Sequence, residues 1–206
     1  MPFVKICGVT DPETAHFAAS LGARFIGIIF ASASERTVDP ERACMIAEEA
    51  KKGGAQVIGV FVEQDGERMQ KIADQVGLDG VQLHGEVARK HHLELSDNLI
   101  RLYVCPVSLD GFIQEESHQG FTALDPQRDY LLYDGLTPGS GKAFDWDALE
   151  PRRDFNFILA GGLNPQNVRL AIQKKQPDGV DVASGVENPR LKKDRKLIRA
   201  FIEEAQ

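Results

Sequence analysis

The sequence predicts an α/β protein built as one closed, eight-stranded parallel sheet with an outer ring of helices, a (β/α)8 barrel. Eight short apolar runs alternate with charged segments of helical pattern, and successive runs begin about 20 to 30 residues apart, close to the size of one βα unit. Strict alternation implies parallel strands joined by right-handed crossovers, and eight units favour closure into a TIM barrel over an open sheet. Because the chain has no low-complexity linker, residues 1–206 are expected to be one catalytic domain.

The first half of the chain contains four of these units. Asp11-Pro12 and Asp39-Pro40 each supply a helix N-cap followed by proline at the first helical position, so helices are expected from there to about residues 21 and 52. Residues 24–30 are too uniformly apolar for a strand with one wet face. The expected strands are 3–7, 24–30, 56–62 and 78–83, and the other expected helices are 65–76 and 86–95.

The second half continues the alternation with weaker helical signals. The expected strands are 99–104, 129–134, 156–160 and 179–182. A short helix is expected near 146–149, after the glycine- and proline-rich loop 135–141, whereas 108–120 is left open. Asn164-Pro165 predicts a helix to about residue 173, and residues 191–205 have the amphipathic pattern of a closing helix.

Composition and charge narrow the class of function. The chain is 42% hydrophobic and 27% charged, which is ordinary for a globular protein with its own core. Its net charge of -7 argues against general binding to nucleic acid or to a membrane, but a few backbone N–H groups and one arginine could still bind a phosphorylated small molecule. The three cysteines lack a CxxC motif, and no apolar run has signal-peptide or membrane-span length, so a cytoplasmic protein is expected.

Two glycine-containing loops are candidates for binding phosphate. In (β/α)8 barrels the active site lies at the carboxyl ends of the strands, and phosphate often binds in the last two loops. Gly161 and Gly162 follow the seventh expected strand, and Ala183, Ser184 and Gly185 follow the eighth. Glycine in either loop alone could simply make the turn, but the two loops together favour an anion site built from backbone N–H groups.

Cys7 and Asp134 are candidates for proton transfer. Cys7 ends the first strand, where its thiol is either inert packing, as expected of Cys44 and Cys105, or a base activated beside a cation. Asp134 closes an apolar strand, where it either caps the next turn or serves as a general acid with its pKa raised by apolar surroundings. Two such groups suit an isomerase, which removes one proton and adds another.

Arg36 and His84 are candidates for substrate binding. Arg36 follows the second strand and is either a solvated surface side chain or the planar partner of a substrate carboxylate. His84 follows the fourth strand, where it either caps the strand or contacts a sugar hydroxyl. Because no cluster has metal-ligand spacing, neither metal nor cofactor is expected, and the lack of GxSxG, GxGxxG and GxxxxGK[ST] motifs weakens hydrolase, dinucleotide and P-loop interpretations.

Six segments, spread over essentially the whole chain, match the pattern of a known family. They are VKICG at 4–8, the segment 30–38 ending in SERTV, VQLHG at 81–85, Asp134 with GSGKAFDW at 139–146, AGGLNPQNV at 160–168, and GVDVASGVE at 179–187. Each is modestly specific, but six in the same order and near the family spacing are highly specific. On these segments the chain resembles phosphoribosylanthranilate isomerase.

The resemblance implies a (β/α)8 barrel that converts N-(5'-phosphoribosyl)anthranilate to 1-(o-carboxyphenylamino)-1-deoxyribulose 5-phosphate in tryptophan biosynthesis. This Amadori rearrangement is an aldose–ketose isomerisation, an intramolecular oxidoreduction that needs no cofactor. The resemblance assigns the general base to Cys7, the general acid to Asp134, the carboxylate to Arg36 and the ribose to His84. It places the phosphate at Gly161, Gly162, Ala183, Ser184 and Gly185, and we expect a monomer.

The chain departs from the family pattern in three loops. Residues 31–34 lack prolines that the family often carries, residues 136–141 form a short version of a glycine-rich lid, and residues 188–194 lack a common glycine. None of these departures touches the expected acid or base.

Other interpretations remain open. Another phosphosugar barrel, such as an epimerase or a thiamine-phosphate synthase, is the nearest, although an epimerase would be expected to place more than one metal-binding histidine at strand ends. A dual-substrate isomerase would be expected to show twofold internal repetition and a second phosphate loop. A catalytically silent barrel that only binds is the alternative of a different class.

Overall fold

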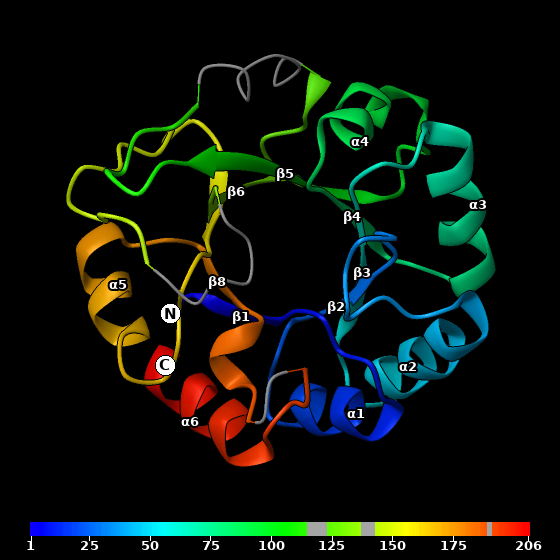
Figure 1. Ribbon diagram of the computed structural model, residues 1–206, viewed down its shortest axis with the longest axis horizontal. Coiled ribbons are helices and arrows are strands. Elements are labelled where there is room, and N and C mark those ends of the chain that lie inside the picture. The colour runs from blue at the N-terminus through cyan, green and yellow to red at the C-terminus, as the bar shows by residue number, and fades with distance from the viewer. Residues whose placement is uncertain (115–122, 137–142, 189–190) are drawn as a thin grey trace. The chain divides into compact units, whose positions relative to one another are not determined.

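A computed structural model describes residues 1–114, 123–136, 143–188 and 191–206. Its strands form a closed barrel in the order β1 to β8, which confirms the predicted fold class. Figure 1 shows the alternation of strands and helices along the chain. The contacts divide the chain into two compact units, one of residues 6–103 and one of residues 1–5 and 104–206, and each is described by itself.

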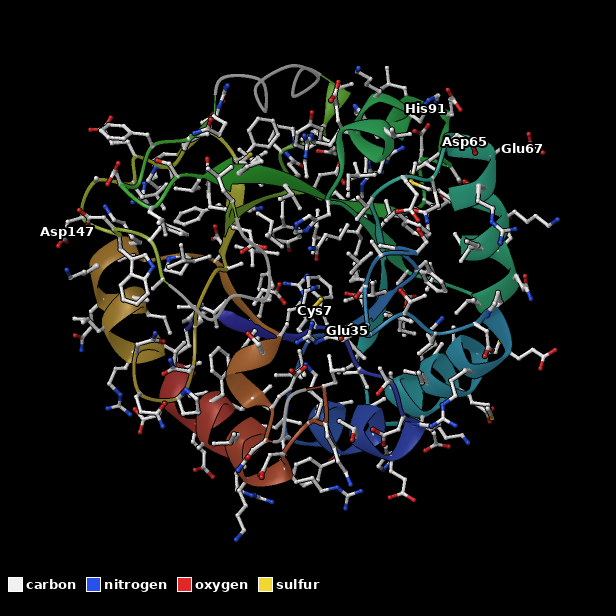
Figure 2. The ribbon with its side chains drawn as sticks, in the orientation of Figure 1. Cys7, Glu35, Asp65, Glu67, His91 and Asp147 are labelled. Atoms are coloured by element: carbon white, nitrogen blue, oxygen red, sulfur yellow. The ribbon has the colours of Figure 1, made fainter. Side chains whose placement is uncertain are left out.

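The unit of residues 6–103 repeats strand and helix in the predicted order, and its first three helices begin where aspartates cap them. Asp11, Asp39 and Asp65 each accept a hydrogen bond from the backbone N–H three residues later, at 2.8, 2.8 and 2.9 Å. Figure 2 labels Asp65 and Glu67 at the start of α3, where acidic groups face the positive end of the helix dipole. The elements are α1 (Pro12–Ser20), β2 (Phe25–Ile29), α2 (Pro40–Lys52), β3 (Gln56–Phe61), α3 (Gly66–Val76), β4 (Gly80–Leu83), α4 (Glu86–Lys90), the 3-10 turn η1 (His92–Glu94) and the first half of β5 (Ile100–Val107).

Strands β2, β3 and β4 of this unit pair in parallel, and β4 pairs with β5. Ile28 lies opposite Gly59, which in turn lies opposite Val81. Ile26 and Ile28 have no exposed surface, as expected of a strand covered on both faces.

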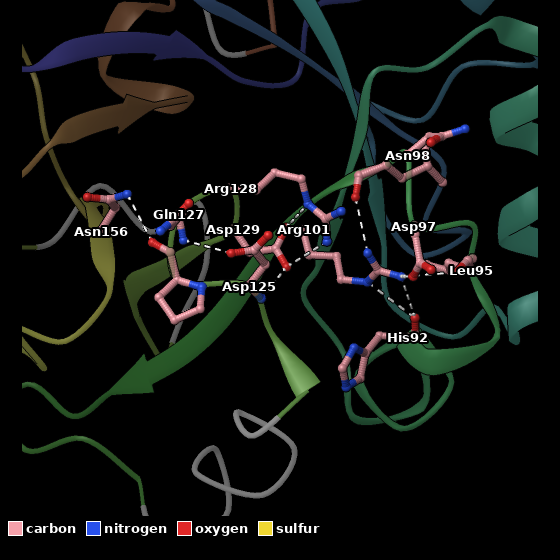
Figure 3. Close-up of polar contacts among 12 residues, drawn as sticks. His92, Leu95, Asp97, Asn98, Arg101, Asp125, Gln127, Arg128, Asp129 and Asn156 are labelled. Carbon is pink, nitrogen blue, oxygen red and sulfur yellow. Dashed lines mark hydrogen bonds and ion pairs between the residues drawn. The ribbon is translucent and has the colours of Figure 1, made fainter.

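The predicted helix 86–95 is interrupted. It ends at Lys90 and resumes as η1, and the buried side chain of Arg101 accounts for the second stop. The Arg101 guanidinium donates hydrogen bonds to the carbonyls of His92 (3.3 Å), Leu95 (3.0 Å) and Leu99 (3.2 Å), as Figure 3 shows. A cation beside the last carbonyls of a helical segment stabilises its end.

The described part of the unit of residues 1–5 and 104–206 contains the last strands and the two helices α5 and α6. Tyr133 of β6 lies opposite Leu159 of β7, which lies opposite Val180 of β8. Phe3 N donates to Asp178 O at 2.9 Å, which ties β1 to the start of β8. The elements are β1 (Phe3–Ile6, whose last residue belongs to the other unit), the end of β5, β6 (Tyr130–Gly135), β7 (Asn156–Leu159), α5 (Val168–Lys175), β8 (Gly179–Val182), the 3-10 turn η4 (Ser184–Val186) and α6 (Arg195–Ala205).

Three predicted helices of this unit are corrected. Residues 146–148 form only a turn, closed by a 3.3 Å hydrogen bond from Leu149 N to Trp146 O, because Pro151 follows too soon for a helix to extend. Helix α5 begins at Val168 rather than after Asn164, since the Asn167 side chain accepts from Asn164 N at 2.8 Å and makes 164–167 a turn.

The closing helix α6 also begins later than residue 191. Asp194 accepts hydrogen bonds from Lys196 N (2.7 Å) and Leu197 N (3.2 Å) and so caps the helix at Arg195. Of the open segment 108–120, the described part 108–114 is not helical, and Ile113 instead makes an antiparallel bridge to Val107. Residues 115–120 lie outside the described chain.

Candidate functional site

Asp134 lies near the end of β6, at the carboxyl edge predicted for it. Its Oδ1 accepts a hydrogen bond of 2.8 Å from Gly135 N, so part of the turn-capping role is present. Burial, the largest cause, and the neighbouring Asp181 carboxylate raise the pKa of Asp134 from 3.8 to about 7, while the Gly135 N–H and the Lys5 ammonium oppose them. A carboxyl group with this pKa holds a proton near neutral pH and can donate it.

Lys5 and Asp181 form a buried ion pair in the same unit. Nζ of Lys5, on β1, lies 3.0 Å from Oδ1 of Asp181, on β8, and their side chains are 0% and 8% exposed. Neither residue is among the site residues predicted from the sequence. The sequence feature that could have identified them is a charged residue inside a short apolar strand, since both have apolar neighbours in short parallel strands.

Gly161 lies beside the Asp134 carboxylate. Its φ of +80° is a left-handed backbone conformation that side chains rarely adopt. A Cβ there would lie 2.9 Å from Gly135 N and 3.2 Å from Asp134 Oδ1. The prediction for Gly161 was phosphate binding, and the structure adds that glycine leaves room for the acid.

The loops after β7 and β8 meet. A Cβ on Gly185 would lie 1.9 Å from the carbonyl oxygen of Leu163, so the two chains pass in backbone contact. The side chain of Asn167 braces the first loop by donating to Gly162 O at 3.0 Å. Ala183, Ser184 and Gly185 are all partly exposed, between the buried Val182 and Val186. The predicted phosphate-binding residues therefore lie in two loops that contact each other, and all five are partly exposed.

In the unit of residues 6–103, Cys7 follows β1 directly and is 5% exposed (Figure 2). The next residue, Gly8, has a φ of +69°, and a Cβ on it would lie 2.7 Å from Cδ of Arg36. The stem of Arg36 thus passes over the Gly8 backbone, one residue from the thiol. The structure brings these two predicted residues together.

Arg36 is 8% exposed, which excludes the interpretation of a solvated surface arginine. Its loop is fixed by hydrogen bonds from Arg36 N to Ser34 Oγ (3.2 Å) and from Val38 N to Ile29 O (3.2 Å). A buried guanidinium on a fixed loop is suited to bind a planar carboxylate with two parallel hydrogen bonds.

His84 follows β4 and is oriented by Gln82, which is not among the site residues predicted from the sequence. Nε2 of Gln82 lies 3.3 Å from Nδ1 of His84, a polar contact that orients the imidazole ring. The backbone N–H of His84 donates to Phe61 O at 2.9 Å, so the strand-capping role is present as well. Gln82 is 2% exposed, and within the described residues its Oε1 has no hydrogen-bond partner. The signal for Gln82 was an amide inside an apolar strand.

Other candidate features are absent from the described residues. No group of three or more His, Cys, Asp or Glu side chains there could hold a metal ion. In the same ranges no helix has the length and apolar composition to cross a membrane. Cys44 and Cys105 are unbridged, and Cys105 has no exposed surface, which fits the packing role predicted for it. Residues 137–142 of the predicted lid lie outside the described chain.

Comparison with known proteins gives one consistent result. The family model described as N-(5'-phosphoribosyl)anthranilate (PRA) isomerase matches residues 4–204. The isomerase of that name from Chlamydia caviae is 41% identical over 200 residues, which cover 97% of this chain and 94% of the relative.

Two solved structures extend the likeness to the fold. A phosphoribosyl anthranilate isomerase in complex with reduced 1-(o-carboxyphenylamino)-1-deoxyribulose 5-phosphate has a TM-score of 0.82 and 36% identity, covering 100% of this chain and 98% of that one. Monomers generated from the dimeric isomerase of Thermotoga maritima have a TM-score of 0.83, 35% identity and the same coverage.

Proposed function

The chain belongs to the N-(5'-phosphoribosyl)anthranilate isomerase family, and we propose that it catalyses this reaction of tryptophan biosynthesis with Asp134 as general acid and Cys7 as general base. The observation that carries the proposal is the environment of Asp134. A carboxyl group whose pKa burial and Asp181 raise to about 7 can donate a proton at the pH where a biosynthetic enzyme works.

The acid step opens the ribose ring. Asp134 protonates the ring oxygen while the aniline nitrogen supplies electrons to C1, so the C1–O bond breaks and an iminium forms. Without the proton the oxygen would have to leave as an alkoxide. Asp134 ends this step as the carboxylate that the Gly135 N–H and the Lys5 ammonium favour.

The base step moves a proton from carbon. The Cys7 thiolate removes the proton from C2, and the electrons of that bond flow into the iminium to give an enolamine, which tautomerises to the ketone. C2 is thereby oxidised from alcohol to ketone and C1 is reduced from the aldehyde level to an amine-bearing carbon. The substrate supplies its own electron sink, so no external oxidant, reductant or cofactor enters the balance.

The remaining residues hold the substrate. Arg36, buried and fixed by its loop, binds the anthranilate carboxylate, and the His84 imidazole contacts a ribose hydroxyl. Gly161 and Gly162, together with Ala183, Ser184 and Gly185, receive the phosphate in the two adjoining loops. These groups contribute orientation, which converts binding energy into rate.

One assay tests both the reaction and the base. Purified wild-type protein is supplied with N-(5'-phosphoribosyl)anthranilate while the loss of its fluorescence is followed, with Cys7→Ala and Cys105→Ala run in parallel. We expect turnover by the wild type and Cys105→Ala, and at least about a 10²-fold lower kcat for Cys7→Ala, as for the loss of one acid–base group. No turnover by folded wild type would overturn the function, whereas turnover by Cys7→Ala would overturn only the role of the thiol.

We further propose that residues 1–206 act as one catalytic domain and as a monomer. A structural relative is a dimeric enzyme that also yields folded monomers, so both states are compatible with the family fold. Light scattering at micromolar concentration tests this proposal, and a mass twice that of the 22.7 kDa chain would overturn it.

A further inference from the structure

A second buried ion pair lies behind the loop that follows β8. Nζ of Lys193 is 2.8 Å from Oε1 of Glu187, and both side chains are 1% exposed. The backbones of the same two residues form an antiparallel bridge. Neither side chain can reach bulk solvent, so neither is a surface charge that serves only solubility.

Each member of the pair also holds backbone. Lys193 Nζ donates to the carbonyl of Ala183 at 2.8 Å, and Glu187 Oε2 accepts from Leu191 N at 3.0 Å. One ion pair therefore ties together the residue that follows β8, the residue that follows η4 and the turn before α6. Buried charged pairs cost desolvation energy and contribute little net stability, so this pair calls for a role in fixing geometry.

The bond to Ala183 fixes the direction of a neighbouring donor. In a trans peptide the carbonyl and the next N–H point in opposite directions, so holding Ala183 O toward Lys193 aims the N–H of Ser184 away from it. Ser184 is partly exposed, and Gly185 rests against the Leu163 carbonyl of the adjoining loop. The loop is thus held on one side by Lys193 and on the other by the loop after β7.

We propose that Lys193 and Glu187 are positioning residues that hold the Ser184 N–H in the direction needed to receive the phosphate of the substrate. The inference rests on the proposed phosphate role of Ala183, Ser184 and Gly185. Two of the three N–H donors of the Lys193 ammonium are directed to Glu187 and to the Ala183 carbonyl, and its side chain is 1% exposed, so it is not presented to a ligand from solvent. It acts through the loop, and its loss weakens phosphate binding without slowing proton transfer.

The test compares Lys193→Met with Lys192→Met, which removes the same charge from the exposed neighbouring residue. Inorganic phosphate is titrated into each folded protein by calorimetry, and KM and kcat are measured separately. We expect Lys193→Met to weaken phosphate binding and to raise KM about tenfold, which matches the loss of about one hydrogen bond, with kcat within about twofold. Lys192→Met should match the wild type in all three values.

A double variant, Glu187→Met/Lys193→Met, separates positioning from stability. Removing both charges leaves no unpaired buried ion, so this protein should fold even if Lys193→Met does not. It should still bind phosphate weakly, because nothing then holds the Ala183 carbonyl. Wild-type phosphate affinity in the folded double variant, or a lowered kcat with unchanged affinity in Lys193→Met, would overturn the proposal. Because phosphate binding is measured without turnover, the effect of Lys193 on binding can be interpreted even if the protein does not catalyse the proposed reaction.

Discussion

The ammonium of Lys5 is paired with the carboxylate of Asp181 at 3.0 Å, and the two act in opposite directions on the proton of Asp134. The Asp181 charge raises the pKa of Asp134, and the Lys5 charge lowers it. The pair therefore adjusts the pKa of Asp134, the proposed general acid, from two strands, β1 and β8, that are 176 residues apart in sequence at this contact.

Asp181→Asn should shift the pH profile of the reaction toward acid. Asp134 must be protonated to act, so activity falls as pH rises through its pKa of about 7. Without the neighbouring negative charge that pKa falls, so the basic limb of kcat/KM should move down by about one pH unit. The measurement is kcat/KM against pH, with Asp178→Asn as control, since exposed Asp178 is not among the groups that shift Asp134. An unmoved limb, or one moved to higher pH, would count against this coupling.

Asp134→Asn should lower kcat at least about 10²-fold and yet make the protein more stable above neutral pH. The folded pKa of about 7 lies above the ordinary 3.8, so the wild type loses stability as pH rises from about 4 to about 7, while an amide does not. A shift of about three units corresponds to about 4 kcal/mol, and partial exposure of the side chain reduces the expected gain to about 2 kcal/mol at pH 8.

Urea unfolding at pH 5 and pH 8 measures this effect. The stability gap between Asp134→Asn and the wild type should widen with pH. A gap that narrows, or the same gap at both values, would show that burial does not hold the proton on Asp134 in the folded state.

Gly161→Ala should lower kcat in addition to lowering the stability of the protein. The added Cβ would lie 3.2 Å from Asp134 Oδ1 and 2.9 Å from Gly135 N, so the acid has to move. Misplacement of a reacting group lowers kcat by about tenfold to a hundredfold. Gly22→Ala is the matched control, because Gly22 has a φ of +98° and nothing within 4 Å of its Cβ position.

Both glycine variants should lose about 1 kcal/mol from backbone strain, but only Gly161→Ala should lose activity. Denaturant midpoints and kcat are measured for the two proteins together. Equal kcat values for the two variants would show that the space Gly161 leaves beside Asp134 has no catalytic consequence.

Local signals predicted most of the fold, and long-range contacts account for what was missed. The caps at Asp11 and Asp39 were readable because proline and an acid follow each aspartate in sequence. At Asn164 the same kind of signal misled, because the side chain that caps the turn belongs to Asn167 and helix α5 starts beyond it. A helix start is a local event, but the choice between two nearby asparagines depends on where the turn packs.

The candidate site shows the same contrast between local sequence signals and long-range contacts. Cys7, Arg36 and Asp134 could be proposed as site residues from their positions after strands, and their roles stay predictions. The partners that tune them could not be proposed in this way, since Asp181 meets Lys5 only once distant strands pair, and Arg36 is buried only once its loop folds over Gly8. The spacing of residues along the sequence does not reveal such contacts.

Leu191→Gly should stabilise the turn before α6. Leu191 has a φ of 72°, in the left-handed region, and it stands in the segment where the family's common glycine is lacking. Its N–H is held by Glu187 at 3.0 Å, which any residue can supply, so the leucine side chain brings strain without a polar contact.

Leu191→Ala is the control, because alanine removes the side chain and keeps the strain. Leu191→Gly should be more stable than Leu191→Ala by about 0.5 to 1 kcal/mol in urea unfolding. This difference is the strain energy that glycine relieves, minus the cost of the greater conformational freedom of glycine in the unfolded chain. Its KM should equal that of the wild type, because the hydrogen bond from residue 191 to Glu187 survives. A glycine variant less stable than the alanine variant would mean that the left-handed backbone costs nothing here.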